Sequence, residues 1–436
     1  MLKIDQRMYS PAVIEKIVFA AGTACSAAKA SKALQKLAGL KVCPVQALRI
    51  THQIGDELRQ QRESDAQAHK RRELKSNNKQ PVDIACVEVD GGRTRTRAHE
   101  QGRGVHAPGW KESKVAAVWR MSGPTFEADP HPEPYPCLLD RDQVPKLATE
   151  MKRQRKAHRV EEGDPQGAGN TEKNSVKRDD DLDFEQASQA LEGLATDVLA
   201  GQSAERLWPP KRIFRTCVAT MKNVHEFGPL VAAEAQKRGF FGAARQVFLG
   251  DGDHNNWRVH KIHFPHFTAI TDFIHVMSYL YETAGAVTDS EAAQWEQYEQ
   301  WVRQAWQGEV ALVIAELSVW QARFGLPDKA TDESDPKRIV SKTVTYLTNN
   351  AARMNYQKYR QAGLPITSSL VESLIKEINH RLKGTDKYWN RLPSKEGAES
   401  MLQVTATLLS DRDELNDFVQ SRPGSMFYRR TPPTPK

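Results

Sequence analysis

The sequence predicts an α/β core that is preceded by one helical segment and interrupted by another. Between about residues 81 and 285, short apolar runs typical of buried strands alternate with segments of helical periodicity, which indicates a sheet with helices packed on it. Residues 10–61 and 287–360 are patterned as helices. With 436 residues, 39% of them hydrophobic, the chain is long enough for several domains and a sizeable core.

Three helices are predicted in the first helical segment. Residues 10–21 and 26–38 form two of them, and Pro44 begins the third, on which Arg49 and Gln53 point away from an apolar face. Two helices joined by a short turn, with Arg and Gln outward, are typical of a helix-turn-helix and equally of a hairpin used for packing or dimerisation. The first interpretation makes Arg49 and Gln53 candidate DNA-binding residues, because Arg and Gln bind the edges of guanine and adenine.

Two predicted strands of the core end in an Asp-Gly pair. Residues 84–90 end at Asp90, and residues 245–250 are followed by Asp251. Carboxylates at the ends of neighbouring strands can converge at one edge of a sheet, and with a third carboxylate they would suit Mg²⁺ or Mn²⁺. A β-turn is the commoner reason for each Asp-Gly pair taken singly. The pairs therefore predict a metal site only in combination.

The third carboxylate, Glu372, belongs to a predicted helix that begins near residue 367. Glu372, Lys376 and Lys383 lie on one face of this helix, and leucines, isoleucines and a valine lie on the opposite face. A carboxylate among cations can hold a metal ion beside a polyanion. An ordinary surface helix with i,i+4 charge pairs shows the same pattern, and the segment alone favours that interpretation.

The remaining elements complete the predicted core and its insertion. Arg93 and Arg95 fall in a basic loop after the first strand, and residues 151–181 are too polar to pack, so a disordered loop is expected there. Residues 287–360 form the helical insertion, with four tryptophans as core anchors. The other predicted elements are strands at 114–120 and 212–221, helices at 183–200, 226–238 and 395–409, and a short strand leading into a helix within 260–281.

Composition limits the classes of partner and compartment. The net charge of +7 indicates an acidic partner, for which nucleic acid is the usual candidate. Five single cysteines without a CxxC pair argue against a zinc knuckle or a disulfide framework and fit a reducing cytoplasm. Five histidines between residues 254 and 275 raise zinc as an alternative, but no HxxxH spacing falls on a predicted helix. No signal peptide and no apolar run of about 18 residues is found, so a cytoplasmic protein without a membrane partner is expected.

Four blocks of the sequence, in this order, resemble bacterial insertion-sequence transposases that carry an Asp-Asp-Glu triad on an RNase H-like fold. They cover most of residues 81–410 and read VEVDGGRTR with GWKESKVA, FLGDGDHNNW, HFPHFTAITDFIHVMSYL, and GLPITSSLVESLIKEINHRLKGTDKYWNR with GAESMLQVTATLLS. The resemblance implies an RNase H-like catalytic core in which Asp90, Asp251 and Glu372 hold Mg²⁺ or Mn²⁺, in a two-ion arrangement.

The resemblance also implies a set of DNA contacts. Besides Arg49 and Gln53, the candidate DNA-binding residues are Arg93, Arg95, Trp257, Lys376, Arg381, Lys383 and Trp389. One departure stands out: family members have Pro-Ile-Gly-Ser-Gly before the glutamate, whereas this chain has Thr367-Ser368-Ser369 in place of Gly-Ser-Gly. That change puts full activity in doubt, because both glycines are lost.

These observations lead to one expected function and two alternatives. The first is a transposase that binds element ends and target DNA as double strands, cleaves and transfers strands, acts as a homodimer or higher oligomer, and is found in the bacterial cytoplasm at the nucleoid. The alternatives are a catalytically impaired DNA-binding descendant and a nuclease without strand transfer. The predicted parts are a helical DNA-binding domain and linker at 1–80, the first part of the catalytic core at 81–285, the helical insertion at 286–360, C-terminal catalytic helices at 361–412 and a flexible tail at 413–436.

Overall fold

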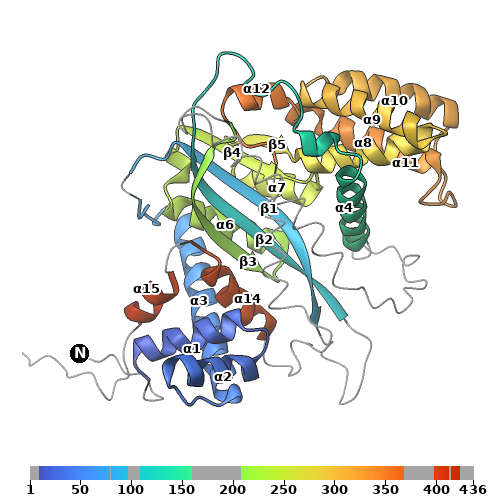
Figure 1. Ribbon diagram of the computed structural model, residues 1–436. Helices are drawn as coiled ribbons and strands as arrows, with labels where there is room; N and C mark the ends of the chain where they lie inside the picture. Colours follow the sequence, from blue (N-terminus) through green and yellow to red (C-terminus); the bar gives the residue numbers. More distant parts are fainter. Residues whose placement is uncertain are drawn as a thin grey trace, which may run out of the picture.

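The computed structural model describes residues 9–78, 80–96, 109–159, 208–367, 397–411 and 414–422. At its centre is a mixed five-stranded sheet with the strand order β3-β2-β1-β4-β5 (Figure 1). The strands are β1 (Ile84–Thr96), β2 (Gly109–Ser122), β3 (Lys211–Thr220), β4 (Arg245–Gly250) and β5 (Thr268–Thr271). The chain is thus a mixed α/β protein, as the alternating pattern predicts.

The sheet combines an antiparallel half with a parallel half. β1 pairs with β2 and β2 with β3 in antiparallel register, whereas β1 with β4 and β4 with β5 are parallel. In the parallel pair β1–β4, Ile84 lies opposite Arg245 and Val89 lies opposite Gly250. The ends of these two apolar runs are therefore level with each other in the middle of the sheet.

Both faces of the sheet are covered by helices. One face, here called the α8 face, carries Ile84, Cys86, Val247 and Leu249 and packs against α4 (Gln143–Arg159), α8 (Phe273–Val287) and α14 (Gly397–Leu408). The other, the α6–α7 face, carries Ala85, Val87 and Phe248 and packs against α6 (Val224–Lys237) and α7 (His254–His263). Successive strand residues alternate between the faces, so every second residue of β1 belongs to the α8 face.

The helical insertion lies at one end of the sheet and packs on α8 (Figure 1). Its tryptophans Trp295, Trp301 and Trp306 are buried, as predicted for core anchors, whereas Trp320 is only half-buried and stacks on Phe324. The helices are α9 (Glu291–Trp306), α10 (Val310–Phe324), α11 (Pro336–Asn350) and α12 (Tyr356–Gln361). Short 3₁₀ turns are η1 (Pro136–Leu139), η4 (Phe240–Gly242) and η5 (Ala351–Arg353).

The N-terminal helices lie toward the other end of the sheet, together with the C-terminal helices. They are α1 (Pro11–Thr23), α2 (Ala27–Ala38) and α3 (Pro44–Lys70), and they share one apolar cluster with α14 and α15 (Glu414–Ser421) (Figure 1). α3 and α14 approach so closely at Gly55 that a Cβ there would lie 2.1 Å from the carbonyl oxygen of Ser400. Arg62 of α3 also donates to Gln403 and Thr407 of α14. The N-terminal helices are therefore joined to the rest of the chain by packing.

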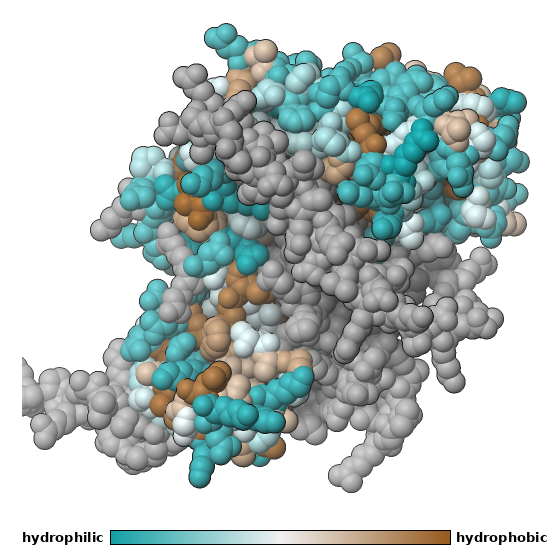
Figure 2. Space-filling view, in the orientation of Figure 1, coloured by the Kyte–Doolittle hydropathy of each residue, from teal (hydrophilic) through white to brown (hydrophobic). Residues whose placement is uncertain are grey.

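Hydrophobic side chains gather on the visible surface of the N-terminal helices (Figure 2). Phe19 of α1 is 52% exposed, Leu37 of α2 is 88% exposed and Val45 of α3 is 58% exposed. By contrast, the described helices include none long and apolar enough to cross a lipid bilayer.

Two predictions of local structure are wrong, and a third falls outside the described residues. The basic loop after Asp90 is strand as far as Thr96, because β2 continues to pair with β1 over that stretch. The polar segment expected to be disordered from residue 151 is the end of α4 up to residue 159, since Met151 is buried and Arg155 pairs with Glu282. The helix predicted at 183–200 and the rest of the polar segment lie outside the described residues.

Two further differences concern α7 and the tail. The helix α7 was not predicted, because only Val259 of its ten residues is buried and the apolar periodicity is correspondingly weak. The tail predicted to be flexible from residue 413 forms α15 instead, with Leu415 and Val419 buried against α1. Residues 423–436 lie outside the described part of the chain.

Candidate active site

The structure brings Asp90 and Asp251 to neighbouring strands at the same level. Val89 of β1 pairs with Gly250 of β4, and each aspartate is the next residue along its chain. Parallel strands lie about 4.8 Å apart. Both aspartates also continue the alternation that places Cys86 and Leu249 on the α8 face. The two aspartates predicted to act together therefore occupy neighbouring positions at one end of the paired β1–β4 stretch.

Hydrogen bonds fix the carboxylate of Asp251. Its Oδ1 accepts from the backbone N–H of Asp253 at 2.9 Å and from Nδ2 of Asn256 at 2.8 Å. The same Nδ2 lies 3.5 Å from the carbonyl oxygen of Val89, so Asn256 links the Asp251 loop to β1. Among the described residues, Oδ2 of Asp251 receives no hydrogen bond. On β1, Oδ1 of Asp90 accepts from the backbone N–H of Gly91 at 2.6 Å.

One helix of the insertion, α11, contacts the loop that carries Asp251. The hydroxyl of Tyr346, on α11, donates to the carbonyl oxygen of Asp251 at 2.8 Å. Gly252 has a φ of 101°, and a Cβ at this position would lie 2.4 Å from the Tyr346 ring. A side chain at residue 252 would thus be strained by its backbone and would also collide with Tyr346. The chain therefore bends at Asp251-Gly252, and its backbone packs closely against α11.

Trp257 joins α7 to the end of α11. Its indole N–H donates to Oδ1 of Asn350 at 2.7 Å, and the guanidinium of Arg353 lies 4.5 Å from the centre of its ring. Asn350 in turn donates to the carbonyl oxygen of Tyr346 at 2.9 Å. The only hydrogen-bond donor of the Trp257 side chain is therefore used within the protein. A DNA contact by this residue stays a prediction.

Two buried acids lie behind the aspartates, and Glu88 is one that sequence reasoning missed. Glu88 precedes Asp90 by two residues on the α8 face, and burial raises the pKa of its carboxyl to about 8. The indole N–H of Trp119 donates to it at 3.1 Å. Asp272, which belongs to the third block of the resemblance, caps α8 by accepting from the N–H of Ile274 at 2.9 Å, and His275 lies 3.9 Å from it.

The predicted third carboxylate, Glu372, lies outside the described residues, together with Lys376, Arg381, Lys383 and Trp389. The described chain ends on one side of this gap at Thr367 and resumes at Gly397. Before the gap, the carbonyl oxygen of Ile366 accepts from the N–H of Phe273 at 3.0 Å. After it, Glu399 accepts from Thr220 at 2.9 Å. Ile366 and Met401 both belong to the core on the α8 face, so both ends of the gap lie on the face that carries the two aspartates.

The carboxylates of Asp90 and Asp251 are of the type that binds a hard divalent cation, but the described residues do not form a complete metal site. No group of three histidine, cysteine, aspartate or glutamate side chains is close enough there to hold a metal ion. Two carboxylates on adjacent strands nevertheless provide the oxygen ligands that Mg²⁺ and Mn²⁺ prefer. Of the five histidines considered as zinc ligands, His260 instead bonds to the carbonyl oxygen of Phe267 at 2.8 Å.

The predicted DNA-binding residues on other elements are differently placed. Arg49 is exposed near the start of α3, whereas Gln53, one turn on, donates to Glu57 at 2.9 Å. Glu57 also pairs with Arg422 after α15. Arg93 and Arg95 are at strand positions of β1 opposite residues 112 and 110 of β2, and their side chains are not among those described.

No protein-family model matches the chain, and no curated protein is significantly similar to it.

Proposed function

We propose that this protein is a DNA transposase of the Asp-Asp-Glu type, with Asp90, Asp251 and Glu372 as its metal-binding triad. One observation carries the proposal: Val89 and Gly250 are paired on adjacent parallel strands, and an aspartate follows each of them on the same face of the sheet. The segment that contains Glu372 starts and ends on that face. The first two aspartates therefore follow paired positions of adjacent strands, and the described residues on both sides of the segment that contains Glu372 pack on the same face.

The topology of the sheet supports an RNase H-like core for the proposed enzyme. Such a core needs an antiparallel β1–β2–β3 unit in one sheet with parallel strands beyond β1, and the order β3-β2-β1-β4-β5 has this form. The helices α9 to α12, between residue 291 and residue 361, then form an insertion between the second aspartate and the glutamate, which is also a feature of the resemblance.

The proposed reaction has two in-line phosphoryl transfers. Water first displaces the 3′ oxygen of a phosphodiester, which leaves a 3′ hydroxyl, and that hydroxyl then displaces the 3′ oxygen of a target phosphodiester and joins the strands. Mg²⁺ or Mn²⁺ bound by the triad would supply charge stabilisation at the phosphate. Asn256 and the N–H of Asp253 hold Asp251 in one orientation, and Tyr346 holds its backbone. No covalent intermediate with the protein is required.

Cleavage of DNA tests the enzyme proposal directly. A duplex that carries the terminal repeats found beside the gene is incubated with Mg²⁺ and the wild type, Asp90→Asn, Asp251→Asn or Asp289→Asn. The last is a matched control, because Asp289 is exposed after α8. We expect the first two variants to lose at least about 100-fold in nicking rate, because each loses a metal ligand. The control should cut like the wild type.

The same assay separates the alternatives. A wild type that binds the repeats and never cuts them with any divalent metal would rule out the enzyme and leave the catalytically impaired DNA-binding protein. Thr367→Gly combined with Ser369→Gly would then restore the turn of the resembling enzymes. Cleavage without joined products would indicate a nuclease. For the transposase we also expect at least a dimer on two DNA ends, and sedimentation that finds one protomer per two-end complex would contradict this.

A further inference from the structure

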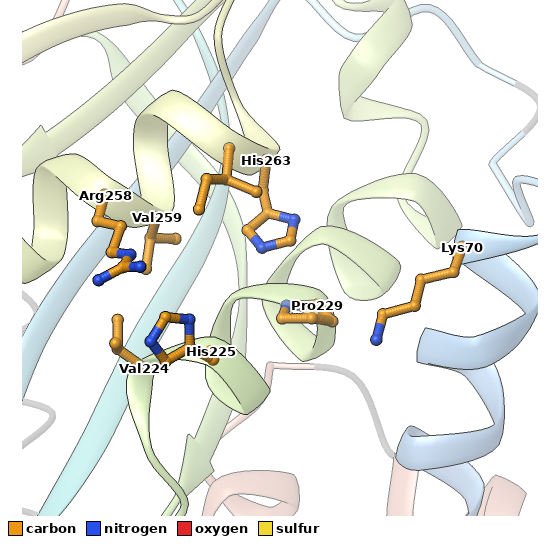
Figure 3. A pocket seen from close by; sticks show the side chains of 8 residues that line it. Lys70, Val224, His225, Pro229, Arg258, Val259 and His263 are labelled. Carbon is orange, nitrogen blue, oxygen red and sulfur yellow. The ribbon is translucent and has the colours of Figure 1, made fainter.

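A pocket lies on the α6–α7 face, on the opposite side of the sheet from the two aspartates. It has a volume of about 210 Å³ and is formed where the end of α3 meets the first turns of α6 and the outer side of α7 (Figure 3). Its walls are Lys70, Val224, His225, Pro229, Arg258, Val259, Ile262 and His263.

The polar side chains of this pocket are basic. Lys70 reaches it from α3, His225 from α6, and Arg258 and His263 from α7 (Figure 3), and none of the eight wall residues is acidic. Within the described chain, neither Lys70 nor Arg258 forms an ion pair. Acidic residues on α3 and α6 form ion pairs with other cations: Glu63 and Glu226 with Lys222, and Asp65 with Lys237. Positive charge is therefore available to a ligand.

The rest of the pocket suits the apolar edge of a sugar. Val259 and Pro229 are buried in its floor, and Ile262 is 56% exposed at its rim. His263 packs against Gly228, and burial together with the charges of His69 and Lys70 lowers the pKa of its imidazole to about 4. The imidazole is thus neutral at pH 7 and would offer a hydrogen bond beside the two permanent cations.

We propose that this pocket binds a phosphate group of a DNA backbone. The two cations come from different helices, α3 and α7, and both are exposed, which suits a polymer that lies across the surface. The same surface continues to His69, which stacks on the partly exposed ring of Phe241 at 5.8 Å. The DNA held here would be a segment distant from the one being cut. The proposal depends on the proposed function only for DNA as the polyanion, since free phosphate has the same chemistry.

The salt dependence of DNA binding tests the pocket. The variant Lys70→Ala/Arg258→Ala is compared with Lys329→Ala/Lys337→Ala, which removes two exposed cations from the insertion. Both pairs are made in the full-length Asp251→Asn chain, so that no DNA is cut. Fluorescence anisotropy follows the binding of a labelled duplex of about 30 base pairs between about 50 and 200 mM NaCl. Thermal unfolding checks that both variants keep the stability of their parent.

We expect the pocket variant to make the slope of log K against log salt shallower by about 1, because one phosphate contact is lost, and the control to leave the slope unchanged. The affinity of the parent should then fall about threefold more over this salt range than that of the pocket variant. Equal slopes for the pocket variant and the control would overturn the proposal. Calorimetry with inorganic phosphate separates the two sources: saturable binding that the pocket variant abolishes, with an unchanged DNA slope, assigns the site to free phosphate and rejects the DNA backbone.

This test is independent of catalysis. If the wild type does not cut DNA but the salt slope of DNA binding still depends on Lys70 and Arg258, the enzyme proposal fails and the phosphate site stands. If the wild type cuts terminal repeats but the salt slope does not depend on these two residues, the phosphate site fails and the enzyme proposal stands.

Discussion

At the scale of single residues, the most informative contact is the one from Tyr346 to the backbone of Asp251. It connects a helix of the insertion to the loop of a proposed metal ligand through one hydrogen bond of 2.8 Å. A backbone hydrogen bond of this kind positions the carboxylate without touching it. Its loss should disturb metal binding more than folding.

Tyr346→Phe tests this positioning role. We expect the free energy of unfolding to fall by only about 1 kcal/mol, the usual value of one hydrogen bond. The Mg²⁺ concentration needed for half-maximal nicking should rise several-fold, and saturating Mg²⁺ should restore most of the rate. Tyr281→Phe on α8 is the matched control, because that residue lies away from the Asp251 loop. A variant whose rate falls without any change in its Mg²⁺ dependence would contradict the positioning role.

His263 gives a prediction about pH. Its imidazole has a pKa of about 4 in the folded protein and 6.5 as its ordinary value, so below pH 6.5 the unfolded chain binds the proton more readily. The stabilising contribution is present above pH 6.5 and is lost as the pH falls toward 4. The loss is at most about 1.4 kcal/mol per pH unit, and less for this half-buried side chain. Urea unfolding at pH 7, 6 and 5 should show a shallower decline for His263→Gln than for the wild type.

At the scale of elements, α3 and α14 cross in close contact although they are far apart in the sequence. Gly55 has no room for a side chain, because the nearest atoms of Ser400 belong to its backbone and cannot rotate away. Any Cβ at this position must push the two helices apart. The apolar cluster that α1, α2 and α3 share with α14 and α15 would be opened as a result.

Gly55→Ala should therefore destabilise the protein by about 2 kcal/mol or more, since overpacking against backbone forces helices to shift. Gly242→Ala is the matched control, as no atom lies within 4 Å of a Cβ there. Differential scanning calorimetry of both variants measures the effect. A Gly55→Ala chain that melts with the control would show that the two helices separate freely.

The elements also show where sequence patterns are sufficient. Strands β3 and β4 were predicted close to their observed bounds, and β1 was predicted correctly at its start, because each contains an apolar run that is buried on both faces. The end of α4 was missed because it is polar and depends on Arg155, which pairs with Glu282 on α8. α15 was missed for a similar reason: two buried residues on a short helix give a weak pattern, and their partner α1 lies about 400 positions earlier in the chain.

The residues of the candidate site also fall into those that sequence patterns predict and those that they do not. Asp90 and Asp251 could be predicted because they follow apolar runs, and the adjacency of those runs is a common outcome in an α/β sheet. Asn256, Tyr346 and Glu88 could not, since their roles depend on contacts that sequence spacing does not reveal. The one signal for Tyr346 was Gly252 itself, which indicates that something approaches the loop closely.

At the scale of the whole molecule, the apolar core of the predicted DNA-binding segment is complete only with residues from later in the chain. The cluster around Ile17, Ile50 and Ile54 is completed by Val404, Leu415 and Val419 from the other end of the chain. We therefore expect residues 1–80 alone to show little stable helix by circular dichroism. Adding a peptide of residues 397–422 should increase the helical signal. A fragment that folds cooperatively by itself would show instead that the N-terminal helices are an independent domain.

The contacts of Arg62 have a consequence for synthesis. This residue bonds to Gln403 and Thr407, which follow it by 341 and 345 positions. A chain that emerges from the ribosome with its N-terminus first presents α1, α2 and α3 early, yet the partners of Arg62 are translated 341 and 345 positions later. The helices proposed to bind DNA are therefore packed completely only after α14 has been made. A nascent chain, or one truncated before α14, would lack a finished DNA-binding surface.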